Sequence, residues 1–82
     1  MSGEHKIEDF KHIIKLTFLD GTAYYNPQAL VGDPYLAARF LKPESTDKDI
    51  AYLRRSVDDE VKIEVVLLED ERKLYKDEYD YD

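Results

Sequence analysis

The chain contains no cysteine, no tryptophan, three glycines and three prolines. Without cysteine, a disulfide framework, a thiolate metal site and a thiol nucleophile are all excluded. The two histidines do not occur in a metal-binding spacing such as HExxH, and the scattered glycines form no phosphate-binding loop. A domain this small rarely encloses a pocket of about 300 Å³ or more. We therefore predict no catalytic residue, no metal site and no cofactor, and we expect a protein that is not an enzyme.

Long apolar runs are also missing. The longest aliphatic run covers residues 65–68, whereas about 20 apolar residues are needed to span a bilayer. The first ten residues are polar and of mixed charge, so no secretory leader is visible. Basic residues are too scattered for a lipid anchor or for a row of phosphate contacts. We expect a cytoplasmic protein that binds neither a membrane nor nucleic acid directly.

The length of 82 residues and the 43% apolar content predict one domain, with flexible ends at residues 1–8 and 78–82. Apolar and polar residues alternate over residues 10–18, which is typical of a half-buried strand. Ile13 falls on the polar face, so partial cover of that face is expected. The pair Asp20-Gly21 that follows predicts a hairpin, with residues 22–25 as the return strand.

The middle of the chain contains two Asx-Pro pairs, which are typical of helix starts. The first predicts a helical turn that begins at Asn26 and stops at Gly32, and the second predicts a short helix over residues 33–41. In that helix Leu36 and Phe40, four residues apart, are expected to face the core.

A third helix is expected from Ser45 or Thr46, one of which would cap it, to residue 55 or 56. Ile50 and Leu53 would form its buried stripe.

Residues 60–68 form the clearest strand pattern in the chain, and its later part is apolar on both faces. This indicates a central strand, or a strand whose outer face, at Val66 and Leu68, meets a partner in a homodimer. A polar turn is expected at residues 69–72, and the last ten residues fit a strand or a helix. The sequence thus predicts an α+β fold: an N-terminal β-hairpin, two or three short helices, then one or two further strands in a small antiparallel or mixed sheet.

Negative charge is concentrated in the second half of the chain. Residues 1–43 carry five Lys/Arg and five Asp/Glu, whereas residues 44–82 carry seven and fourteen and account for the entire net charge of −7. Such a field attracts basic partners and repels nucleic acid and anionic membranes. Two interpretations stay open. The carboxylates form a functional acidic surface, or they are a solvated face whose charge is cancelled by bases such as Arg54, Arg55 and Arg72.

The candidate partner-binding residues lie in the last 25 positions of the sequence. Carboxylates on one face of a strand lie about 6.6 Å apart, and those three or four residues apart on a helix about 5–6 Å apart. Both spacings approximate a row of backbone phosphates. Tyrosines alternate with these acids near the C-terminus, which suits an Arg- and Lys-rich partner through cation–π contacts. The predicted site comprises Asp58, Glu60, Glu64, Glu69, Asp70, Glu71, Tyr75, Asp77, Glu78 and Tyr79.

The acidic runs at residues 58–60 (Asp-Asp-Glu) and 69–71 (Glu-Asp-Glu), in a small chain without cysteine, resemble those of small phage-type inhibitor proteins that mimic DNA. The resemblance implies a non-enzymatic protein that blocks a basic DNA-binding protein, often as a dimer. Two alternatives remain. One is an immunity protein or antitoxin that neutralises a basic toxin, with Tyr75 and Tyr79 as anchors. The other is a structural accessory subunit.

Overall fold

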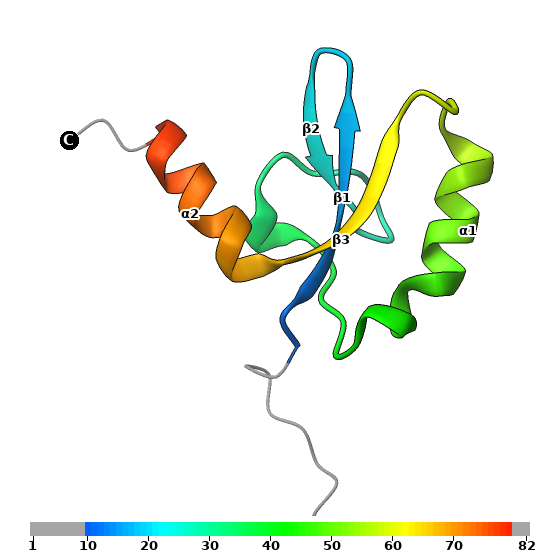
Figure 1. The fold of residues 1–82 in the computed structure, drawn as a ribbon, viewed down its shortest axis with the longest axis horizontal. Coiled ribbons are helices and arrows are strands. Elements are labelled where there is room, and N and C mark those ends of the chain that lie inside the picture. The colour runs from blue at the N-terminus through cyan, green and yellow to red at the C-terminus, as the bar shows by residue number, and fades with distance from the viewer. Residues whose placement is uncertain (1–9, 80–82) are drawn as a thin grey trace, which may run out of the picture.

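A three-stranded antiparallel sheet with one helix on each side forms the core of the protein (Figure 1). The computed structural model describes residues 10–79, with side chains to residue 74. The elements are β1 (His12–Phe18), β2 (Gly21–Tyr24), the 3₁₀ helices η2 (Pro34–Leu36) and η3 (Pro43–Thr46), α1 (Asp47–Ser56), β3 (Lys62–Leu67) and α2 (Leu68–Tyr79). The strand order is β2-β1-β3. This architecture is the mixed α+β fold that the sequence predicts.

Strands β1 and β2 form the predicted hairpin, but its loop lies one residue earlier than the Asp-Gly pair indicates. Phe18 pairs with Gly21, so the two loop residues are Leu19 and Asp20, and Gly21 already belongs to β2. Open space surrounds Gly21, and its backbone is not in the left-handed region. The loop therefore leaves Leu19 wholly exposed at the hairpin tip, at 101%.

The first face of the sheet packs against α1. Ile14 and Leu16 of β1 are fully buried there, together with Leu53 of α1 and Val61. Ile50 is half-buried in the same cluster, so the predicted stripe of this helix is confirmed. Thr46 occupies the N-cap position, but its hydroxyl donates to the Pro43 carbonyl (2.7 Å) and does not cap the helix.

The second face of the sheet is covered by η2 and α2, on the other side from α1 (Figure 1). Ile13 is fully buried there with Tyr24 and Ala37, which confirms the expected cover of this face. Because β1 packs on both faces and pairs with both neighbours, it is the central strand of the sheet.

Strand β3 confirms the strand predicted from residue 60 onward, but it is an edge strand and not a central one. Val66 and Leu68 pack against the Ile13 cluster of their own chain. Their apolar character therefore reflects the intramolecular core, and they are not the free outer face on which the predicted homodimer depended.

The connection between β2 and α1 contains less helix than the sequence predicts. Only a single turn forms after Asn26, in which its carbonyl accepts from Ala29 N (3.1 Å) and its Oδ1 accepts from Gln28 N (3.0 Å). The chain then extends, and Val31 forms a β-bridge with Tyr24. The residues of this segment thus satisfy their backbone groups against the sheet and not within a helix.

The helix expected over residues 33–41 is reduced to the three residues of η2. Asp33 caps it as predicted, with Oδ1 accepting from Tyr35 N at 2.9 Å. Leu36 is 59% exposed, so its predicted core position is wrong, whereas Phe40 is half-buried against the first cluster. Phe40 N donates to His12 O (2.7 Å), which draws this segment into an extended conformation and ends the helix early.

Helix α2 begins at Leu68, so the polar turn predicted at residues 69–72 is wrong. Its first turn carries Glu69, Asp70 and Glu71, and negative side chains are stabilising at a helix N-terminus. Of the predicted flexible ends, residues 1–8 and 80–82 lie outside the described residues. Glu78 and Tyr79 form the last two positions of α2.

Candidate functional site

The hairpin tip and the loop between α1 and β3 together form an open groove of about 540 Å³. Its charged lining consists of Asp20, Asp58, Glu60 and Lys62, and the rest of the lining is Thr17, Phe18, Leu19 and Val61. All three carboxylate residues are exposed. The groove therefore combines an apolar floor with an acidic rim, which suits a basic side chain with a long aliphatic stem.

One base, Lys62, lines the groove with the three carboxylates, but it forms no ion pair with them. Among the side chains that the structure describes, one ion pair forms, between Lys15 and Glu71. Arg54, which precedes Asp58 by four residues, instead donates from Nη1 to the Val61 carbonyl (3.0 Å). Arg72 lies over the Tyr35 ring, 5.8 Å from its centroid. Arg54 and Arg72 thus have other contacts, and the groove, with three acids and one base in its lining, carries a net negative charge.

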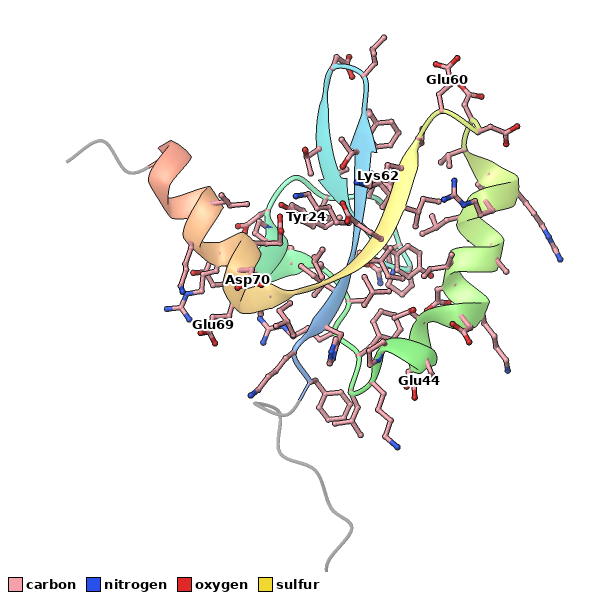
Figure 2. The ribbon with its side chains drawn as sticks, viewed as in Figure 1. Tyr24, Glu44, Glu60, Lys62, Glu69 and Asp70 are labelled. Atoms are coloured by element: carbon pink, nitrogen blue, oxygen red, sulfur yellow. The ribbon has the colours of Figure 1, made fainter. Side chains whose placement is uncertain are left out.

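A second exposed acidic pair, Glu69 and Asp70, begins α2. Figure 2 shows Glu60 and Glu69 at opposite ends of β3. From a rise of about 3.3 Å per strand residue, these ends are about 17 Å apart, which exceeds the screening length of about 8–10 Å. Glu69 and Asp70 also share a hollow with three bases, Lys11, Arg39 and Arg72. The predicted acids therefore form two separate groups and not one continuous row.

Glu71 is one of the predicted partner-binding residues, but the structure buries its side chain. Its Oε1 accepts a hydrogen bond from the Tyr24 hydroxyl (2.8 Å) and lies 3.1 Å from Lys15 Nζ. Glu64, also predicted, is half-buried and pairs with Lys15 across β1 and β3. The Glu71 carboxylate serves the interior contact between α2 and the sheet. Among the described side chains Glu64 forms no ion pair, so it lies opposite Lys15 in strand register only. Neither residue extends the acidic surface.

Sequence reasoning missed Lys15 and Tyr24, the two residues that contact the Glu71 carboxylate. Lys15 lies on the same strand face as Ile13, which the sequence already expects to be covered. A lysine on a covered face needs an acidic partner, and that requirement could have indicated the pair. The partner itself is 47 residues from Tyr24 in the sequence, so local patterns do not identify it.

The remaining predicted residues, Tyr75, Asp77, Glu78 and Tyr79, belong to α2. Their side chains lie outside the part of the chain whose side chains are described. The structure therefore brings Asp58 and Glu60 together, places Glu69 and Asp70 at the other end of β3, and leaves the tyrosine anchors a prediction.

Tyr25 is the buried phenol beside a third, smaller hollow of about 270 Å³, which Tyr52 also lines. Burial raises the pKa of Tyr25 above its usual value of 10.0, and the nearby Asp49 carboxylate raises it further. Both effects favour the neutral phenol.

Comparisons with known proteins do not assign a family. No protein-family model matches the chain, and neither the curated proteins nor the solved structures contain a match. Within residues 10–79, no group of three or more His, Cys, Asp or Glu is arranged to hold a metal ion. No helix in that range is long and apolar enough to cross a membrane.

Proposed function

We propose that this protein is a non-enzymatic acidic binding protein that occupies the basic, DNA-binding surface of a partner protein. The observation that carries the proposal is the set of exposed carboxylates at the hairpin tip, Asp20, Asp58 and Glu60, none of which forms an ion pair within the described side chains. Unpaired surface charge attracts an oppositely charged protein and steers its approach. With a net charge of −7, the chain favours a basic partner.

The contact surface in this proposal consists of the two acidic groups at the ends of β3. The first group is Asp20, Asp58 and Glu60. The second is Glu69 and Asp70, whose field is weakened by the three bases that share their hollow, so the first group carries most of the attraction. Each group would meet a separate basic region of the partner, in the way that phosphates on two parts of a DNA site do. Glu71 is not part of this surface because its buried carboxylate is engaged with Lys15 and Tyr24. Glu64 is left out of the surface because its side chain is half-buried.

The test begins with capture of partners from a cell lysate at low and high salt, followed by their identification by mass spectrometry. DNA-binding proteins that are retained at low salt, released at high salt and displaced by duplex DNA support the proposal. Retention of only neutral or acidic proteins contradicts it.

The captured partner is then titrated with matched charge variants. Glu60→Gln and Glu69→Gln each remove one carboxylate from the proposed surface. Glu44→Gln removes one exposed carboxylate from η3, which Figure 2 places away from both acidic groups. We expect Glu60→Gln to weaken binding about two- to fivefold, as the loss of a single charge at an interface rim does. Glu69→Gln should weaken it less, because three bases share its hollow, and Glu44→Gln should change it little. Equal effects of all three variants would show that only net charge matters and that this surface is not the contact.

A further inference from the structure

The outer edge of β3 presents backbone groups that no described segment pairs. In an antiparallel sheet, alternate residues of a strand direct their N–H and C=O groups to opposite neighbours. Tyr25 N donates to Ile14 O (3.0 Å), so the backbone N–H and C=O groups of Ile14, and of every second residue of β1 counted from it, point toward β2. On the other side, Leu68 N donates to Lys11 O (2.7 Å). Even-numbered residues of β3 therefore bond to β1, and the backbone groups of Ile63 and Val65 point away from the sheet.

The two edges of the sheet differ in how they are covered. On the β2 edge, Tyr24 N donates to Val31 O (2.7 Å) and Val31 N donates back to Tyr24 O (2.9 Å). Within residues 10–79, no backbone hydrogen bond from another segment reaches the outward-pointing groups of Ile63 or Val65. Leu67, at the end of the same edge, is 40% exposed. A partly apolar edge strand with free backbone donors and acceptors is a template for another strand.

We propose that a second copy of this chain pairs antiparallel with the β3 edge and forms one sheet of six strands, three from each copy. The charge pattern of β3 selects this occupant. Lys62 and Glu64 lie two residues apart and on the same face of the strand. A two-fold axis at Ile63 places Lys62 opposite Glu64 of the second copy, and Glu64 opposite Lys62, so two ion pairs form by symmetry.

The neighbouring registers are less favourable. An axis at Glu64 sets two carboxylates directly opposite each other, which is destabilising. An axis at Val65 sets Lys62 opposite Leu68 and removes its partner. With the axis at Ile63, the two Ile63 residues exchange both backbone hydrogen bonds, and Val65 N–H reaches the Val61 carbonyl of the other copy. That carbonyl already accepts from Arg54 (3.0 Å), but it has a second lone pair.

The proposal is tested by sedimentation of the full chain from about 10 µM to about 1 mM, the range expected for a small edge-to-edge interface. The wild type is expected to form a concentration-dependent dimer. Lys62→Glu and Glu64→Lys should each weaken it about tenfold, because each variant faces its own copy with like charges. An equimolar mixture of the two variants should dimerise again, because the carboxylate introduced by the first variant then faces the ammonium introduced by the second.

Two backbone variants separate the two edges of the sheet. Val65→Pro removes an outward N–H from β3, and Thr22→Pro removes one from β2, and proline is tolerated where the N–H faces solvent. We expect the first to weaken the dimer about tenfold through two lost hydrogen bonds, one per copy, and the second to leave it unchanged. Far-UV circular dichroism checks that each variant folds.

Two results would overturn the proposal. One is a wild type that stays monomeric at the highest concentration, and the other is a mixture of charge variants that dimerises no better than either alone. The mixing result is decisive even where a proline variant fails to fold. Neither result bears on the acidic binding function, which is tested with a different partner.

Discussion

Replacing Glu71 with glutamine tests the buried ion pair that attaches α2 to the sheet. Glu71 Oε1 accepts from the Tyr24 hydroxyl at 2.8 Å and lies 3.1 Å from Lys15 Nζ. The side chains of Lys15 and Glu71 are only 19% and 6% exposed. Glutamine keeps the shape of the side chain and can still accept from Tyr24, but it leaves the Lys15 ammonium without its carboxylate.

The expected cost follows from this geometry. Removing one partner of a fully buried ion pair costs about 3–5 kcal/mol. Because Lys15 keeps some contact with water and the Tyr24 hydrogen bond survives, we expect Glu71→Gln to lower the free energy of unfolding by about 1–3 kcal/mol. A domain of this length has a total of about 4–12 kcal/mol. The variant should therefore unfold at clearly lower urea concentration.

The assay is urea unfolding followed by circular dichroism, with Glu60→Gln as the control. Glu60 is exposed, so its variant should stay within about 0.5 kcal/mol of the wild type. Lys15→Met and the double variant complete a cycle, in which the coupling between positions 15 and 71 should be about 1–3 kcal/mol. Equal midpoints for Glu71→Gln and Glu60→Gln, or a coupling of zero, would refute the reasoning.

Two further predictions concern the core and the buried phenol. Leu53→Ala should cost about 2–5 kcal/mol in urea unfolding, because Leu53 is 3% exposed in the first cluster, whereas Leu36→Ala should cost less than about 0.5 kcal/mol at a site that is 59% exposed. In an absorbance titration, the Tyr25 phenol, identified as the signal that is lost in Tyr25→Phe, should ionise above its ordinary pKa. Asp49→Asn should move that pKa back toward 10.0. A raised phenol pKa contributes stability that is fully present below the unfolded pKa of about 10 and is lost as pH rises through the folded pKa. If Asp49→Asn leaves the titration unchanged, or Leu53→Ala costs no more than Leu36→Ala, the corresponding prediction is wrong.

The sequence predicts the sheet better than the segment that connects its strands. Alternation over residues 10–18 and 60–68 depends on burial of strand faces, which the finished fold preserves. The two Asx-Pro pairs are weaker guides, because Asn and Asp side chains close turns by the same hydrogen bonds with which they cap helices. At Asn26 the turn forms alone, and at Asp33 it is followed by only three helical residues.

The candidate site is predictable in composition but not in arrangement. Local sequence identifies the acidic runs at residues 58–60 and 69–71, and the structure exposes most of their side chains. The local sequence does not indicate that α2 turns Glu71 inward, or that the buried carboxylate meets Lys15. Those facts depend on tertiary contacts between residues far apart in the chain, which spacing alone does not encode.

The central position of β1 has a consequence for how the chain acquires its structure during synthesis. The β1–β2 hairpin closes locally, yet the other edge of β1 pairs with β3, whose residues follow about 50 positions later. Until that late segment leaves the ribosome, the apolar side chains of the hairpin lack most of their cover. Non-local pairing of this kind slows folding and prolongs exposure of apolar surface. A nascent chain that stalls before β3 should therefore be the form most prone to aggregate and most dependent on chaperones.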